Sequence, residues 1–167
     1  MYLDYGSAAR IFAVPTPGVE NVLLTAPLPA LLINEFLADN KTTITNPATG
    51  TFDDWIELWN AGATPADLFD LCITDNASAL TKWRFPGSLV VEPGQHVLLW
   101  ADDTPAYGPQ HLPFKLSASG EEIVLVASDG SNVIDAVQFG PQAADVSYGR
   151  YPDGEGGARS NAAFRTM

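Results

Sequence analysis

Two histidines, one cysteine and several acid pairs are the residues of this chain whose types could carry out chemistry. His96 and His111 could act as imidazole bases, but neither lies in a sequence that resembles a nucleophile elbow or another hydrolase motif. The single Cys72 sits in an apolar run, where a thiol behaves as a small hydrophobic side chain. We therefore expect no catalytic residues, and a hydrolase that uses the acidic loops stays open as an alternative.

The acid pairs suggest two kinds of site, a calcium site or a glycosidase dyad. Calcium takes about six to eight oxygen ligands. Loop carboxylates of Asp53, Asp102 and Asp103, together with backbone carbonyls, could supply them. No stretch has EF-hand spacing, however, and adjacent acids on a strand point to opposite faces. A glycosidase would need two carboxyl groups about 5–10 Å apart across a sugar-sized cleft. The sequence favours solvated acids, with calcium as an open alternative.

Trp55 and Trp59 are the predicted binding residues. They share one face of a predicted strand, whereas Ile56 and Leu58 share the other. We expect the branched aliphatic residues to face the core, so that the tryptophans flank Glu57 on the opposite face. That face is either covered by a loop or open as a stacking platform for a sugar or a peptide.

Arg150, Glu35 and Glu57 are charged residues within sequence that otherwise resembles buried strand. A bidentate guanidinium–carboxylate pair is an effective way to place charge inside a sandwich. We therefore predict a structural ion pair between Arg150 and either Glu35 or Glu57 on neighbouring strands. A solvated, unpaired Arg150 would contradict this prediction.

The elements that must position these residues are short strands. Turn signals recur at short intervals, and no long amphipathic helical pattern appears. Asp129-Gly130 predicts a hairpin between its flanking apolar segments. Together these features predict an all-β, antiparallel β-sandwich of about eight or nine short strands. The predicted strands are Leu31–Ala38, Asp54–Asn60, Asp67–Thr74, Lys82–Phe85, His96–Ala101, Phe114–Ser117, Ile123–Ala127, Val133–Phe139 and Ser147–Tyr151.

Composition limits the class of protein. The 167 residues suffice for one well-buried core, and 46% hydrophobic with 17% charged residues exclude a wholly disordered chain. The net charge of -12 repels nucleic acid and anionic membrane surfaces, so we expect no nucleic-acid partner. No run approaches the roughly 20 apolar residues of a membrane span, so we expect no membrane insertion.

The order of several short motifs resembles a bacterial lamin-tail domain, which is an immunoglobulin-like sandwich. Leu32–Ala38 resembles its first strand, and Asp54–Leu58 matches its Asp-Trp-Ile-Glu-Leu-type strand. Glu92–Asp102 matches a Pro-Gly turn and the strand after it. Phe114–Glu121 and Ser147–Gly154 match two further stretches, Phe-x-Leu-Ser-x-x-Gly-Glu and Ser-x-Gly-Arg-x-Pro-Asp-Gly. The resemblance covers residues 31–160 in the expected order.

Residues 1–30 differ in composition, being rich in Pro, Ala and Leu, and indicate a leader or linker before a domain at 31–167. Similar domains often close with Thr-Pro-Gly-x-x-Asn, which here occurs at Thr16–Asn21 instead of after Phe164. We therefore expect an excised piece of a longer protein, whose first residues end a preceding module. A competing hypothesis is self-association, in which the leader docks on a neighbouring molecule.

The resemblance implies a noncatalytic interaction or spacer module that binds a protein or glycan partner. It also implies that the module belongs to a larger exported or cell-surface protein. The alternative is a calcium- or carbohydrate-binding accessory domain of an extracellular enzyme. Since a fold does not specify a function, the partner must be argued from the residues of a site.

Overall fold

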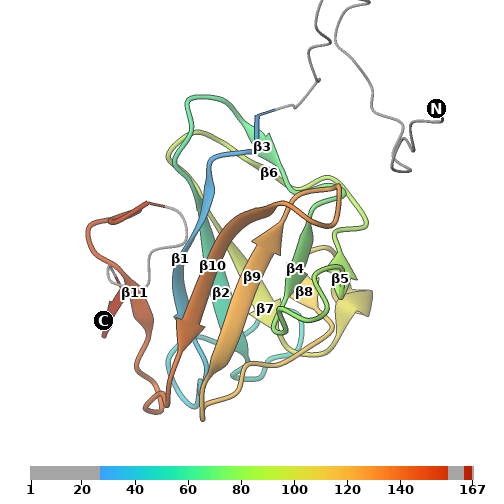
Figure 1. Cartoon of the computed structure of the whole chain (residues 1–167). Helices are drawn as coiled ribbons and strands as arrows, with labels where there is room; N and C mark the ends of the chain where they lie inside the picture. Colours follow the sequence, from blue (N-terminus) through green and yellow to red (C-terminus); the bar gives the residue numbers. More distant parts are fainter. Residues whose placement is uncertain (1–26, 158–163, 167) are drawn as a thin grey trace, which may run out of the picture.

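In the computed structural model, which describes residues 27–157 and 164–166, two β-sheets pack face to face (Figure 1). The larger sheet has the order β12-β11-β1-β2-β7-β8, and the smaller one has the order β10-β9-β4-β5. All neighbouring strands are antiparallel except β7 and β8. The predicted all-β antiparallel sandwich is therefore confirmed.

The described residues contain twelve strands and one short 3-10 helix at Pro105–Tyr107. No helix there is long and apolar enough to cross a membrane. The six-stranded sheet consists of β1 (Leu31–Leu37), β2 (Asp54–Asn60), β7 (His96–Ala101), β8 (His111–Leu112), β11 (Tyr148–Arg150) and β12 (Phe164–Thr166). The four-stranded sheet consists of β4 (Cys72–Thr74), β5 (Trp83–Arg84), β9 (Glu121–Val126) and β10 (Val133–Phe139), and a separate ribbon pairs β3 (Ala66–Asp67) with β6 (Val90–Val91).

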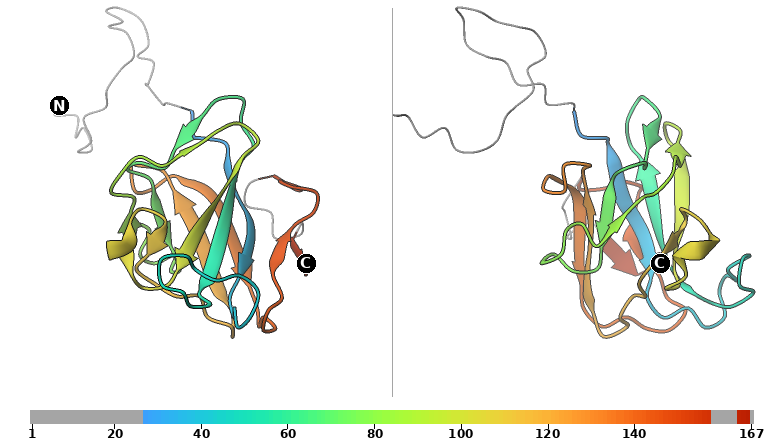
Figure 2. Two further views of the ribbon diagram at one scale, coloured as in Figure 1. Left: turned by 180° about the vertical axis from the view of Figure 1, so that it is seen from behind. Right: turned by 90° about the vertical axis from the view of Figure 1, so that its right-hand side faces the viewer.

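The core lies between the two sheets, which Figure 2 shows as separate layers in its right-hand view. Alternation along each strand decides which side chains enter the core. In β2, Ile56 and Leu58 are fully buried in it, as predicted, and in β9 Ile123 and Leu125 enter the same core from the other sheet. Burying one such side chain contributes roughly 1.5–3 kcal/mol, so the inward side chains of these strands stabilise the sandwich through apolar burial.

The β9–β10 hairpin confirms the turn prediction at Asp129-Gly130. Gly130 has a φ of 72°, a left-handed conformation that glycine adopts without steric cost. The Asp129 carboxylate accepts hydrogen bonds from the backbone N–H groups of Ser131 and Asn132, both at 2.9 Å. Asp129 therefore serves to form the turn.

Two strand predictions were wrong. Phe114–Ser117 forms no strand, although Phe114 and Leu116 are buried. The two side chains alternate because they enter the core from a segment that is not paired with a neighbouring strand. The predicted strand Asp67–Thr74 is split between β3 and β4, because Asp70 has a φ of 66° and interrupts extended backbone. The short strands β6, β8 and β12 were missed, since two or three residues give little periodic signal.

A buried ion pair between Arg150 and Asp135 joins the two sheets. Both side chains are 0% exposed, and Arg150 Nη2 lies 3.1 Å from Asp135 Oδ2. The same carboxylate accepts a hydrogen bond from the Ile33 N–H at 2.8 Å, while Arg150 Nε donates to the Ile33 carbonyl at 2.9 Å. The register of β1 shifts between Ile33 and Glu35, and that of β10 between Val133 and Asp135. The ion pair thus supplies partners to backbone groups where two irregular strands meet.

The prediction that Arg150 pairs with Glu35 or Glu57 was therefore wrong. Arg150 faces inward, and its guanidinium group lies 4.6 Å from the centre of the Phe164 ring in the core. Glu35 and Glu57 are opposite each other in the β1–β2 register and point away from the core. A strand side chain cannot reach an acid on the other face of its own sheet, so Arg150 pairs with an acid of the facing sheet.

Candidate functional site

The outward side of β1, β2 and β7, here called the outer face, brings together most of the residues singled out from sequence. Because the three strands are in antiparallel register, their outward side chains form rows across the sheet. One row is apolar, one contains two acids, and one pairs an indole with an imidazole. The rows are Leu37–Trp55–Trp100, Glu35–Glu57–Leu98 and Leu32–Trp59–His96.

Trp55 belongs to the apolar row and is only 8% exposed. It packs with Leu37 and Trp100 in a small cluster separate from the main core, and Leu98 lies against the same cluster. The tryptophan predicted as a binding residue is thus a packing residue at one end of the outer face. Its burial removes it as a stacking platform for a sugar or a peptide.

Trp59 is half-buried and belongs to the opposite row. Its ring stacks on the imidazole of His96, with centroids 6.2 Å apart and planes inclined by 25°. Gly154, from the loop after β11, lies against the same indole; a Cβ at this position would clash with the ring, and its φ is 70°. The loop coverage expected for the tryptophans therefore applies to Trp59.

Asn34 fastens this loop to the outer face. Its amide oxygen accepts a hydrogen bond from the Gly154 N–H at 3.0 Å, and its Nδ2 donates to Asp153 Oδ1 at 3.2 Å and to Glu57 Oε1 at 3.3 Å. His96 Nε2 lies 3.4 Å from Asp153 Oδ2 and 3.8 Å from Glu57 Oε1. One asparagine and one histidine thus hold two carboxylates in a fixed position beside Trp59.

The acid row contains two like charges directly opposite each other, Glu35 and Glu57. Directly opposed like charges in an antiparallel pair destabilise it by roughly 0.2–1 kcal/mol. Burial raises the pKa of Glu57, and the charges of Glu35 and Asp153 raise it further, against the opposing effects of Asn34 and His96. Strands β1, β2 and β7 contain no Lys or Arg. The outer face therefore carries two acids without a Lys or Arg on its own strands, and His96 of β7 is the basic residue beside Glu57.

Glu57→Gln is expected to raise the melting temperature by about 1–4 °C at neutral pH. The raised pKa means that the folded state takes up this proton more readily than the unfolded state, so the ionised carboxylate lowers stability at neutral pH. The gain should shrink as the pH falls through the raised pKa, where wild-type Glu57 becomes protonated. Calorimetry at several pH values measures this, with Glu92→Gln, an exposed acid, as the control. A lower melting temperature in Glu57→Gln would contradict the argument.

A second polar cluster surrounds Asp102, at the end of β7. Its carboxylate accepts hydrogen bonds from His111 Nδ1 at 2.6 Å, Asn46 Nδ2 at 3.0 Å and the Thr104 N–H at 2.9 Å. Burial by itself raises the pKa of Asp102, but the bonds from His111 and Thr104 outweigh it and hold the pKa below its usual value. Asn46 Nδ2 also donates to Asp53 Oδ2 at 2.9 Å. Donors from three residues thus surround the Asp102 carboxylate, although the buried Thr104 hydroxyl has no hydrogen-bond partner among the described residues.

This network does not favour the calcium alternative. Asp53 and Asp102 do come together, but through the Asn46 amide, and their oxygens accept hydrogen bonds from protein donors. Asp103 is exposed, with a φ of 62°. No group of three or more His, Cys, Asp or Glu residues in the described ranges is arranged to hold a metal ion. Cys72 is fully buried, and burial raises the pKa of its thiol, so it packs as a hydrophobic side chain.

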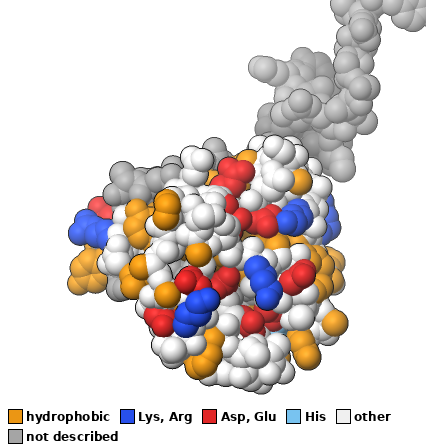
Figure 3. All heavy atoms as spheres, turned by 90° about the horizontal axis from the view of Figure 1, so that it is seen from below, with side chains coloured by type: hydrophobic (Ala, Val, Ile, Leu, Met, Phe, Trp, Pro, Cys, Tyr) orange, Lys and Arg blue, Asp and Glu red, His pale blue; other side chains and the backbone are white. Residues whose placement is uncertain are grey.

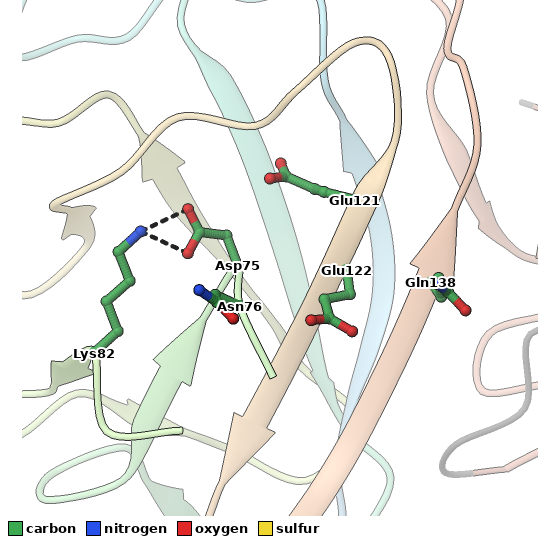
Figure 4. Close-up of a pocket in the computed structure, with 6 residues that line it drawn as sticks. All are labelled: Asp75, Asn76, Lys82, Glu121, Glu122 and Gln138. Atoms are coloured by element: carbon green, nitrogen blue, oxygen red, sulfur yellow. Dashed lines mark hydrogen bonds and ion pairs between the residues drawn. The ribbon is translucent and has the colours of Figure 1, made fainter. Parts of the chain in front are cut away.

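A hollow of about 390 Å³ on the four-stranded sheet is also acidic and is lined by Asp75, Glu121 and Glu122 together with Lys82 (Figure 4). Lys82 Nζ lies 2.6 and 2.7 Å from the two oxygens of Asp75. Glu121 and Glu122, both on β9, each accept a hydrogen bond from a loop N–H group. A Lys side chain thus balances one acid of this hollow, whereas the strands of the outer face supply no Lys or Arg to its acid row.

The loop end of the sandwich carries charges of both signs, as Figure 3 shows. A depression of about 250 Å³ there is lined by Lys41, Lys115 and Phe52 together with acids. Lys41 Nζ lies 2.7 Å from Asp39 Oδ1, so part of this charge is paired within the chain. The mixture gives no single sign of potential by which this end would select a partner.

The chain belongs to the lamin tail domain family, whose model matches residues 25–141. Members of this family are noncatalytic, immunoglobulin-like domains, in agreement with the sandwich described above. No curated protein and no solved structure matches the chain. The match ends before β11, so Arg150 and the loop that carries Asp153 lie beyond the matched residues.

The predicted leader or linker at residues 1–30 lies almost wholly outside the described residues, which begin at residue 27. Self-association through this leader therefore stays a prediction. The boundary between a leader and a domain at 31–167 stays a prediction as well.

Proposed function

We propose that this domain is a noncatalytic interaction module of a larger exported or cell-surface protein, and that it binds a protein partner through the outer face. The observation that supports binding is the opposed pair Glu35 and Glu57, two half-buried acids that lie on the outer face and contribute no contact to the core. Directly opposed like charges cost stability, and arrangements that cost stability recur at functional sites. The exported or cell-surface location rests on the resemblance to bacterial lamin-tail domains.

A protein partner is favoured over a glycan because of how Trp59 is packed. Sugar binding by an aromatic side chain needs an open ring face, whereas this indole contacts His96 and Gly154. What the outer face offers instead is a group of half-buried side chains from three neighbouring strands, the acids Glu35 and Glu57 and the apolar Trp59 and Leu98. Such a mixed surface is typical of protein interfaces. A spacer role alone would not require it.

Peptide and glycan arrays probed with the full chain test this proposal, alongside chromogenic assays for esterase, phosphatase and glycosidase activity. We expect saturable binding to peptides, a loss of that binding in Trp59→Ala, and no turnover of any substrate. Trp83→Ala, which alters a tryptophan of the four-stranded sheet, is the matched control. Turnover that follows the protein through purification, or an absence of saturable binding on both arrays, would overturn the proposal.

A further inference from the structure

We infer that Asn76 is an acceptor for an N-linked glycan, attached through its side-chain nitrogen. The inference rests on export of the larger protein, which is part of the proposed function, but it does not depend on a partner at the outer face. It follows from a short sequence motif that occurs twice and from the different burial that the fold gives to the two copies.

The motif is Asn-x-Ser/Thr, with any residue except Pro in the middle, which is the acceptor sequence for N-glycosylation. It occurs in this chain as Asn40-Lys41-Thr42 and as Asn76-Ala77-Ser78. The motif by itself is short enough to arise by chance. A glycosyl transferase needs the amide nitrogen of the asparagine and room for a bulky sugar, so burial and hydrogen bonding decide which copy can serve.

Asn40 is built into the interior of its loop and is only 5% exposed. Its Nδ2 donates hydrogen bonds to the carbonyls of Ile44 and Asp53, both at 2.8 Å. A primary amide has two N–H groups, and a glycan replaces one of them. Modification would therefore break one of these bonds and force a sugar into packed protein, so the fold excludes Asn40.

Asn76 lies in the turn that follows β4, and Asn76, Ala77 and Ser78 are all exposed. The Asn76 carbonyl accepts a hydrogen bond from the Ala79 N–H at 2.9 Å, which closes a β-turn. Its Oδ1 accepts from the Ser78 N–H at 2.9 Å, so the amide is oriented through its oxygen. Its Nδ2 donates no hydrogen bond to the other described residues. The acceptor nitrogen thus has no competing partner.

The donor is an oligosaccharide linked to a polyprenyl diphosphate. Nδ2 of Asn76 attacks the anomeric carbon of the first sugar, and a carbon–nitrogen bond forms. The bond between this carbon and the diphosphate oxygen breaks, and polyprenyl diphosphate leaves with the electron pair. The amide proton passes to a base of the transferase, so the step involves no oxidation or reduction.

The position of Asn76 keeps a glycan away from the outer face. Asn76 follows a strand of the four-stranded sheet and lines the hollow on that sheet, whereas the outer face belongs to the six-stranded sheet (Figure 4). A glycan there would cover the hollow and leave Trp59 and its neighbours uncovered. Glycosylation and partner binding can therefore be measured independently.

The experiment incubates the folded full chain with a purified oligosaccharyltransferase and a fluorescent oligosaccharide linked to a polyprenyl diphosphate. Peptide mass spectrometry then locates the sugar. We expect transfer to Asn76, with occupancy at Asn40 lower by about tenfold or more, because Asn40 must first be released by local unfolding. Asn76→Gln and Ser78→Ala should abolish this transfer, and Ser78→Thr should retain it. Thr42→Ala, which removes the other copy of the motif, is the matched control and should leave transfer to Asn76 unchanged.

Synthetic peptides that span each motif, treated with the same enzyme, measure acceptance without the fold, and we expect both to be modified. A folded chain in which Asn76 stays unmodified would rule out the inference. Equal occupancy at Asn40 and Asn76 in the folded chain would do the same, because it would show that the fold does not select between them. Neither result bears on the array experiments, so the interaction module can fail or stand separately.

Discussion

Arg150→Met is expected to lower the free energy of unfolding by about 3–5 kcal/mol, because it leaves the Asp135 carboxylate buried without its cation. The guanidinium group also donates to the carbonyls of Ile33, Glu155 and Gly157, all of which lose this donor. Urea unfolding measures the change. Lys82→Met, which breaks the exposed pair with Asp75, is the control and should cost no more than about 1 kcal/mol.

The double variant Arg150→Met/Asp135→Leu distinguishes an ion pair that only balances charge from one that also supplies hydrogen-bond partners to backbone groups. Replacing a simple buried pair by apolar side chains is often neutral or stabilising. Here the N–H and the carbonyl of Ile33 would both lose their partners, at roughly 1–3 kcal/mol for each buried group. The double variant should therefore stay at least about 2 kcal/mol below the wild type. Full recovery of stability would show that the pair is not needed by the backbone of β1.

Asp102→Ala is expected to cost about 2–4 kcal/mol, because it removes the acceptor of three hydrogen bonds at a buried position. The side chains of Asp102 and His111 are 1% and 8% exposed, so water replaces these bonds poorly. Urea unfolding at neutral pH measures the loss. Asp103→Ala, at the exposed neighbouring position, is the control.

The effect of Asp102 should also depend on pH. Its pKa is lower in the folded state than the ordinary value of 3.8, so the folded state favours the ionised form. The stability that it contributes is present above the unfolded pKa and is lost as the pH falls through the folded pKa. The difference between wild type and Asp102→Asn should therefore shrink in strong acid. A difference that is constant with pH would mean that the ionised form has no special role.

These two expectations have the opposite sign to that for Glu57. Arg150 and Asp102 are buried charges whose partners belong to the chain, so removing either is expected to weaken the fold. Glu57 is a half-buried charge beside like charges, and removing it is expected to strengthen the fold. This contrast separates residues that hold the sandwich together from a residue whose charge the fold does not need.

Alternation along single strands was enough to predict the outward side of β2. Because side chains in a strand alternate by geometry, the sequence around Glu57 shows that Ile56 and Leu58 share one side and the two tryptophans the other. The same local signal predicted the extents of β2, β7 and β10 and the turn at Gly130. These features depend only on residues close together in the chain.

The burial of Trp55 and the partner of Arg150 could not be obtained in this way. Asp135 enters the core because the register of β10 shifts beside it, and alternation alone does not reveal such a shift. Its contact with Ile33 joins residues about a hundred positions apart. The acid row likewise exists only because β1 and β2 pair in one register, which sets Glu35 against Glu57.

The sequence by itself therefore determined the all-β class, the principal strands and the side of β2 that faces inward, since these follow from the two-residue period of an extended chain. Tertiary structure alone decided which charges are paired in the interior and which remain on the surface. Those outcomes depend on the register between strands and on the packing of two sheets, where a shift of one residue moves a side chain from one face to the other.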